Sequence, residues 1–286
     1  MKRITLQSPA KLNLFLKVIK KRKDGYHAIE TLFERINLCD DITLACNHTG
    51  RISIRCNDPQ VPVSPRNLAW QAARLMQEKF SLKNGVDITI KKRIPVAAGL
   101  GGGSSNAATV IMGLSNLWKL SLQRQDMLDY ARQIGSDVAF FLYRCNFALG
   151  TGRGEVITPL VIRKKLWHVV VVPETKVYSS QVYRALKLKL TKVNHDVNML
   201  IHALRRDGVS SLKSLLANDL ETAIVQRHPK LLNIKNHIIC RCGLEQAHFS
   251  GSGPALFGIV NSARDAATGA AVLKRYYKRV FVTRTV

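Results

Sequence analysis

The glycine-rich segment at residues 95–106 constrains the fold of this chain more than any other stretch. Apolar and polar residues alternate just before it, over residues 86–90, as they do in a half-buried strand. Just after it, apolar residues recur at helical spacing over residues 107–118. The pattern predicts a strand, a glycine loop and then a helix whose N-cap is Ser104 or Ser105.

Such a loop suits the binding of an anion. Gly99 and Gly101–Gly103 have no Cβ, so their backbone amides can approach a ligand closely. The amides at a helix N-terminus point outward where the helix dipole is positive, and this arrangement favours a di- or triphosphate. The segment matches neither the Walker loop nor G-x-G-x-x-G. A flexible glycine hinge is the alternative interpretation, but the strand before the loop and the helix after it favour the anion site.

The remaining pattern predicts an α+β chain of two parts. Strands dominate the first 60 residues, with turns at residues 20–25 and 39–41, and a helix follows at 67–80. A further helix at residues 127–134 stops at Gly135. The pattern restarts after the sequence Gly-Thr-Gly-Arg-Gly-Glu at residues 150–155. Beyond it we expect a buried strand, basic helices and a closing strand, turn, strand, helix and strand, which gives two domains, 1–155 and 156–286.

Composition narrows the class of protein without choosing a function. The 44 Lys and Arg residues exceed the 19 Asp and Glu residues, for a formal net charge of +25, while 46% of residues are apolar. That apolar share excludes a disordered chain, and the charge favours an anionic partner such as nucleic acid, a membrane surface or a phosphorylated metabolite. The six cysteines are scattered, so we expect reduced thiols and no metal site. No apolar run resembles a membrane span or a secretory signal, which predicts a cytoplasmic protein.

Two charged residues are candidates for chemistry. Lys11 lies beside the apolar face of a predicted strand, and Asp137 lies between Gly135 and a short apolar element at residues 138–143. Taken singly, Lys11 is an ordinary strand-edge lysine and Asp137 is a helix N-cap. Phosphoryl transfer needs a group that takes the acceptor's proton and cations that offset charge, and these two residue types supply both. Spacing alone does not show that they meet.

Five blocks of sequence together resemble the GHMP kinase superfamily. They are Pro9–Leu14, Asp24–His27, Gly99–Ala108, Gly135–Val138 and Gly251–Pro254. The match is closest to the members that phosphorylate the C2 hydroxyl of 4-diphosphocytidyl-2-C-methyl-D-erythritol, in the non-mevalonate route to isopentenyl diphosphate. The Asp-Gly-Tyr-His block singles out these members. The resemblance implies an α+β, two-domain fold, with an N-terminal ATP domain like ribosomal protein S5, a C-terminal α/β-plait-like domain and the active site in the cleft between them.

The resemblance also implies a role for individual residues. Lys11 and Asp137 would be the catalytic pair, with Asp137 accepting the proton of the hydroxyl that attacks the γ-phosphate of ATP. The residues expected to bind ATP are Asn67, Pro95, Val96, Ala97, Ala98, Gly99, Leu100, Gly101, Gly102, Gly103, Ser104 and Ser105, the Ser105 hydroxyl being a candidate contact for phosphate or Mg²⁺. Those expected to bind the cytidine substrate are Asn13, Tyr26, His27, Ser179 and Tyr183; Ser179 stands where the family usually has Thr.

The implied cofactors are ATP and Mg²⁺, with no metal site formed by the protein alone. The implied partner is a small-molecule substrate, without a specific nucleic acid or a membrane, for a monomer or homodimer. Two rivals remain at this point. A homoserine- or mevalonate-type kinase would share the phosphate loop and would not need Tyr26 and His27. A basic nucleic-acid-binding protein that had kept the fold and lost the chemistry would lack Lys11, Asp137 or the loop serines, and all of these are present.

Overall fold

Two long antiparallel strands organise the first half of the computed structural model, which describes residues 2–186, 196–206 and 209–286. Strand β1 (Arg3–Lys21) pairs with β2 (His27–Asn47) over nearly its whole length. Pro9 lies opposite Cys39 but Ala10 lies opposite Ile36, so β2 carries extra residues there. The prediction of a turn at residues 39–41 is therefore wrong. A bulge absorbs the extra residues and the strand continues through them.

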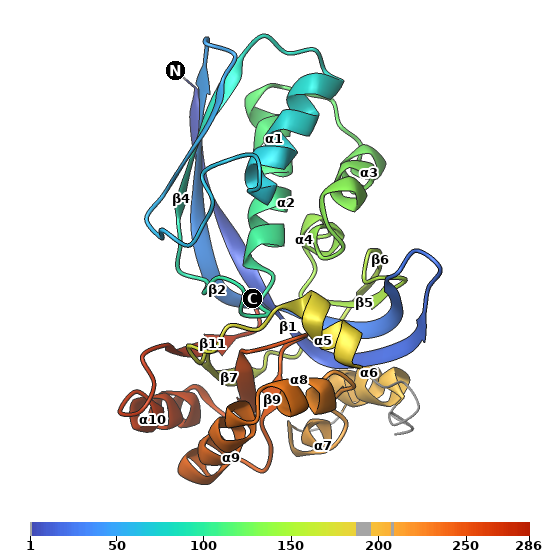
Figure 1. The fold of residues 1–286 in the computed structure, drawn as a ribbon, viewed down its shortest axis with the longest axis vertical. Coiled ribbons are helices and arrows are strands. Elements are labelled where there is room, and N and C mark those ends of the chain that lie inside the picture. The colour runs from blue at the N-terminus through green and yellow to red at the C-terminus, as the bar shows by residue number, and fades with distance from the viewer. Residues whose placement is uncertain (1, 187–195, 207–208) are drawn as a thin grey trace.

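The first sheet places one layer of helices over these strands. Its strand order is β3-β4-β2-β1-β8, and β5 pairs with both β2 and β6. The upper part of Figure 1 shows the helices packed along one side of the sheet. The elements of this half are β3 (Ile52–Cys56), α1 (Leu68–Lys79), β4 (Gly85–Lys91), α2 (Gly102–Leu117), α3 (Arg124–Ile134), α4 (Val138–Leu142), β5 (Phe147–Thr151) and β6 (Val156–Leu160).

The second half is built on a four-stranded antiparallel sheet in the order β11-β7-β10-β9. The lower part of Figure 1 shows its helices gathered below that sheet, with α5 beside the first half. Its elements are β7 (Trp167–Val171), α5 (Ser179–Ala185), α6 (Val197–Arg206), α7 (Val209–Lys213), β8 (Ala217–Asn218), α8 (Glu221–Arg227), α9 (Lys230–Cys242), β9 (His248–Phe249), β10 (Leu256–Val260), α10 (Ala263–Leu273) and β11 (Val280–Arg284).

The two halves are packed together by a shared apolar core. One of three buried clusters combines Leu12 and Phe15 of β1 with Val170 of β7 and Phe257 of β10. Strand β8, far along the chain, adds to the first sheet as a parallel neighbour of β1. Strand β6 pairs with β5, so the first sheet continues past residue 155. The division into 1–155 and 156–286 stays a prediction.

The start of α2 differs from the expectation. The helix begins at Gly102, and its N-cap is Gly101 in the left-handed conformation rather than Ser104 or Ser105. A Cβ at Gly101 would lie 2.9 Å from Lys11 Cγ, so a serine does not fit at the cap position. The other predicted boundaries agree better. Helix α3 ends at Gly135, and Asp137 is the N-cap residue of α4, although its side chain makes no capping hydrogen bond.

Within the described ranges, no helix is long and apolar enough to cross a membrane. The six cysteines are free thiols, and the described residues contain no group of three His, Cys, Asp or Glu side chains that could hold a metal ion.

Candidate active site

The glycine loop is held between β1 and a turn near the end of the chain. On the β1 side, the amide of Lys11 donates to the carbonyl of Leu100 at 3.0 Å. On the other side, the hydroxyl of Ser250 donates to the carbonyl of Gly99 at 2.9 Å. Gly99 has a φ of +78°, and a Cβ there would lie 2.2 Å from the carbonyl oxygen of Ser250. Glycine is required at this position because the two loops touch through their backbones.

A buried carboxylate anchors both ends of the loop. Asp40 Oδ2 forms an ion pair with Lys92 Nζ at 2.6 Å and accepts a hydrogen bond from Asn106 Nδ2 at 2.9 Å. Asp40 Oδ1 accepts the backbone amides of Arg93 and Ile94, each at 2.8 Å. Asp40 therefore connects the strand side of the loop, at residues 92–94, with helix α2. The bulge in β2 places this carboxylate there, which sequence analysis did not foresee.

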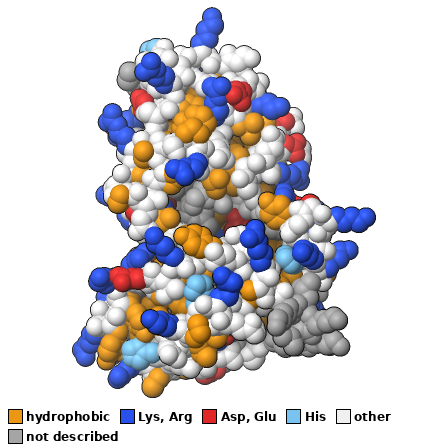
Figure 2. Space-filling model, viewed as in Figure 1, with side chains coloured by type: hydrophobic (Ala, Val, Ile, Leu, Met, Phe, Trp, Pro, Cys, Tyr) orange, Lys and Arg blue, Asp and Glu red, His pale blue; other side chains and the backbone are white. Residues whose placement is uncertain are grey.

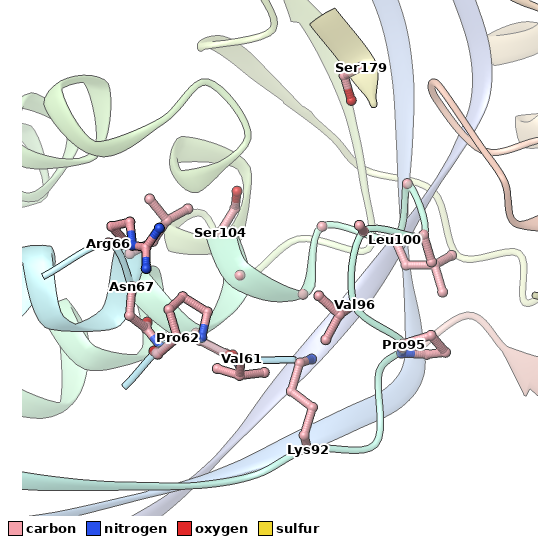
Figure 3. A pocket seen from close by; sticks show the side chains of 18 residues that line it. Val61, Pro62, Arg66, Asn67, Lys92, Pro95, Val96, Leu100, Ser104 and Ser179 are labelled. Atoms are coloured by element: carbon pink, nitrogen blue, oxygen red, sulfur yellow. The ribbon is translucent and has the colours of Figure 1, made fainter. Parts of the chain in front are cut away.

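A cavity of about 470 Å³ opens over the loop and the start of α2. It is lined by residues 95–104 and by the α1 side at Asn67, the residues expected to bind ATP apart from Ser105. Figure 3 shows Asn67 and Arg66 on one side, with Ser179 reaching in from α5 on another. The Asn67 side chain caps α1 by accepting the Ala69 amide at 2.9 Å, so it combines a capping role with a place in the cavity wall.

The two loop serines have different surroundings. Ser104 lines the cavity. Ser105 is fully buried, and its hydroxyl accepts a hydrogen bond from the hydroxyl of Ser8 at 2.8 Å. The structure therefore does not bring the Ser105 hydroxyl to the cavity, where the sequence analysis expected it.

Lys11 and Asp137 lie 126 positions apart in the sequence, and the fold brings them together. Lys11 Nζ lies 3.4 Å from Asp137 Oδ2, and the side chains are 5% and 33% exposed, respectively. Lys11 also donates to Asn13 Oδ1, and the Asn13 amide group donates to Thr31 Oγ1 at 2.8 Å. The ammonium group is thus oriented from two directions, while the carboxylate stays open to solvent.

A second cavity, of about 840 Å³, contains this pair. Lys11, Asn13 and Asp137 lie in its wall together with Tyr26 and His27, from the turn between β1 and β2. Its remaining expected residues, Ser179 and Tyr183, come from α5. Gly99, Gly101 and Ser179 line both cavities, so the two spaces adjoin at the glycine loop. The space-filling view in Figure 2 shows a hollow between the two halves.

Aromatic rings gather at one end of the second cavity. The rings of His27 and Tyr183 are stacked, with centroids 5.3 Å apart and planes inclined by 25°. Burial, with a smaller contribution from Lys21, lowers the pKa of His27, which favours a neutral imidazole. Burial and the nearby Asp137 raise the pKa of Tyr183, so its phenol is neutral. Flat neutral rings of this kind can stack on a planar base.

Three cations in the same wall, Lys21, Arg153 and Arg184, are not predicted from the sequence. Arg153 lies in the glycine-containing stretch at residues 150–155, which the sequence pattern had already marked as the point where a new part begins. Nothing in the sequence placed that stretch beside Tyr26. Only the pairing of β5 with β2 does so.

Comparison with known proteins shows which family the chain belongs to. Residues 67–144 match the model of the GHMP kinases N terminal domain. The chain is 42% identical over 260 residues to 4-diphosphocytidyl-2-C-methyl-D-erythritol kinase of Geobacillus kaustophilus, covering 90% of this chain and 88% of that protein. It is 40% identical to the same enzyme of Geobacter metallireducens, covering 93% and 92%.

Solved structures give the same answer for the fold. A crystal structure of 4-(cytidine 5'-diphospho)-2C-methyl-D-erythritol kinase superposes with a TM-score of 0.83 at 32% identity, covering 99% of this chain and 100% of that one. A homoserine kinase from Cytophaga hutchinsonii, at 18% identity and a TM-score of 0.77, shares the fold over 100% of this chain and 95% of its own. This chain belongs to the GHMP kinase superfamily and, within it, to the family of 4-diphosphocytidyl-2-C-methyl-D-erythritol kinases.

Proposed function

We propose that this chain transfers the γ-phosphate of ATP to the C2 hydroxyl of 4-diphosphocytidyl-2-C-methyl-D-erythritol, as its relatives' names imply. The observation that carries the proposal is the Lys11–Asp137 pair, which lies in a cavity that adjoins the glycine-loop cavity on one side and contains stacked rings at its other end. Phosphoryl transfer depends mainly on positioning and on neutralising charge, and this arrangement supplies both.

In the proposed step, Asp137 accepts the proton of the C2 hydroxyl. The hydroxyl oxygen forms a bond to the γ-phosphorus, the bond from that phosphorus to the β–γ bridging oxygen breaks, and ADP leaves. The ammonium of Lys11, 3.4 Å from the Asp137 carboxylate, offsets negative charge that develops around the transferred group. Asn13 holds Lys11 on this side of the carboxylate.

The triphosphate of ATP fits the glycine loop. The first amides of α2 have no partner within the helix, and Gly103 leaves open space, its built Cβ meeting only Leu68 Cδ1 at 3.7 Å. Residues 95–104 would hold the phosphates, and Asn67 would lie near the adenine. Mg²⁺ would neutralise phosphate charge. It is usually bound by one or two carboxylates together with substrate phosphates, and the Ser104 hydroxyl in the wall of the glycine-loop cavity would be an oxygen donor to it.

The cytidine end of the substrate would occupy the aromatic end of the second cavity. Tyr26 and Tyr183 offer faces for stacking on cytosine, and the neutral His27 imidazole can read its polar edge. Ser179, whose hydroxyl lies 2.6 Å from that of Ser252, and Asn13 would contact the substrate nearer its reacting end. The partners we propose are these small molecules, without nucleic acid or membrane, for a cytoplasmic monomer or homodimer.

Release of ADP from Mg·ATP and the cytidine substrate tests the proposal. Replacing Asp137→Asn removes the proton acceptor while keeping its size, and we expect kcat to fall by roughly 10²–10⁴-fold. Asp129→Asn is the matched control, because Asp129 is a half-exposed carboxylate on α3 that pairs with Arg132. A wild type that turns over homoserine or mevalonate but not the cytidine substrate would contradict the proposal. So would full activity of the Asp137 variant.

A further inference from the structure

The turn between β5 and β6 runs along the wall of the substrate cavity. At one point it is fixed to the start of β2, since the carbonyl of Gly152 accepts the amide of Ile29 at 2.7 Å. At another it passes the catalytic carboxylate, because a Cβ on Gly154 would lie 3.8 Å from Asp137 Oδ1. The turn therefore runs from the start of β2, next to Tyr26 and His27, to the Asp137 carboxylate.

Arg153 extends from this turn over the ring of Tyr26. Its guanidinium carbon lies 4.8 Å from the ring centroid. The backbone amide of Arg153 donates to the Glu155 carboxylate, and its Nε lies 3.7 Å from Glu155 Oε1. Among the described residues, none accepts a hydrogen bond from the guanidinium. Stacking uses the flat face of the group, so its edge remains able to donate to a ligand.

The charges around Arg153 favour an anion. Glu155 pairs with Arg153 at 3.7 Å from outside the cavity lining, and the two carboxylates in the cavity wall have other cationic neighbours, Asp24 with Arg22 at 2.9 Å and Asp137 with Lys11 at 3.4 Å. Lys21, Arg153 and Arg184 add positive charge to the same wall. Arg153 is less exposed than Arg184, with 27% of its side chain accessible. A guanidinium suits bidentate contact with phosphate oxygens.

The chemical order of the substrate then assigns a position to its diphosphate. The molecule consists of a base, a ribose, a diphosphate and a branched alcohol, in that order. With the base at the aromatic end and the hydroxyl at Asp137, the diphosphate lies alongside the turn that carries Arg153. We propose that Arg153 is a specificity-determining residue that binds the substrate's diphosphate, with Tyr26 holding its guanidinium in place; this rests on the proposed function.

Steady-state kinetics of Arg153→Met and Arg153→Lys test this assignment. Charge-assisted hydrogen bonds contribute enough that Arg153→Met should raise KM for the cytidine substrate by about 10- to 100-fold. The KM of Arg153→Met for ATP should stay within about twofold of the wild-type value. For the cytidine substrate, the KM of Arg153→Lys should lie between those of the wild type and Arg153→Met. The control is Arg241→Met, which removes a guanidinium stacked 5.3 Å from the Tyr276 ring, outside the residues that line either cavity. An unchanged KM for the cytidine substrate would overturn the assignment.

Direct binding separates contact with the diphosphate from support of Tyr26. Titration calorimetry with CDP and with cytidine, for wild type and Arg153→Met, should show a larger loss of affinity for CDP. Equal losses for both ligands would mean that Arg153 only supports the ring, and the assignment would fail. If the wild type does not phosphorylate the cytidine substrate, the proposed function fails instead, and the CDP comparison still decides about Arg153.

Discussion

At the scale of single residues, the site depends on side chains that hold one another. Lys11 faces Asp137 because Asn13 accepts its hydrogen bond, and Asn13 is fixed in turn by Thr31, whose hydroxyl donates to the carbonyl of Phe15 at 2.7 Å. The chain Lys11, Asn13, Thr31 crosses from β1 to β2 through buried space. An amphipathic pattern predicts neither that these three polar side chains are buried nor which polar atoms pair, because pairing depends on strand register.

The pKa of His27 gives a prediction about pH. Burial holds this pKa below its ordinary value of 6.5, so in the window just below 6.5 the unfolded chain binds more protons than the folded one. The contribution of His27 to stability is therefore lost as pH falls through that window. We expect the melting temperature of the wild type, relative to His27→Gln, to be lower at pH 5 than at pH 7.5. A difference that does not change with pH would contradict this.

At the scale of elements, two neighbours hold the backbone of the glycine loop, Lys11 through the carbonyl of Leu100 and Ser250 through that of Gly99. The strand, loop and helix were predictable, since each has its own spacing of apolar residues. The start of α2 was not, because serines are favoured caps in general, whereas the cap position here is left-handed and packed against Lys11 and Phe141, which requires Gly101. The burial of Ser105 follows from the same feature: because α2 begins at Gly102, the Ser105 side chain points toward Ser8.

Adjacent aspartates provide a matched test of how the loop is anchored. Asp40→Asn leaves the Lys92 ammonium buried without its carboxylate, which should cost about 3–5 kcal/mol of unfolding free energy and raise KM for ATP. Asp41 pairs with Arg93 at 2.6 Å nearer the surface, and Asp41→Asn should cost about 0–1 kcal/mol. Urea denaturation and ATP kinetics measure both effects. Similar losses in the two variants would show that Asp40 is not the anchor.

At the scale of the whole molecule, a buried pair joins the two sheets. His168 of β7 lies 3.0 Å from the carboxylate of Glu34 in β2, and both side chains are fully buried. Near the end of the chain, the Thr285 hydroxyl donates to the same carboxylate. Glu34 belongs to the first sheet, His168 to the second, and Thr285 follows the last strand. The pair therefore forms only when the two halves are packed together.

Removing this pair should weaken the whole fold. His168→Leu removes the imidazole whose Nε2 lies 3.0 Å from Glu34 Oε2, an oxygen that accepts no hydrogen bond among the described residues, and we expect the unfolding free energy to fall. Thr283 lies opposite His168 in the adjacent strand, and its buried hydroxyl has no hydrogen-bond partner among the described residues. Thr283→Val should therefore change stability little. If chemical denaturation gives the two variants equal midpoints, the pair does not hold the halves together.

The net charge of +25 belongs to this scale as well. Figure 2 shows Lys and Arg side chains spread over both halves of the visible face rather than gathered at the hollow. A positive field attracts phosphorylated ligands and polyanions alike, in a way that salt screens. The charge is thus general background, and the specific binding that we propose depends on the loop amides and on a few placed cations.

Local sequence patterns suffice to predict the elements and the chemistry available to them. The glycine loop, the helix stop at Gly135 and the blocks that carry the family resemblance all depend on neighbours in the chain. Tertiary structure alone decided that Lys11 meets Asp137, that Ser104 rather than Ser105 faces the cavity, and that Arg153 lies over Tyr26. The physical reason is that these contacts join strands, turns and helices far apart in sequence, and their geometry is set by bulges, register and packing that no local pattern encodes.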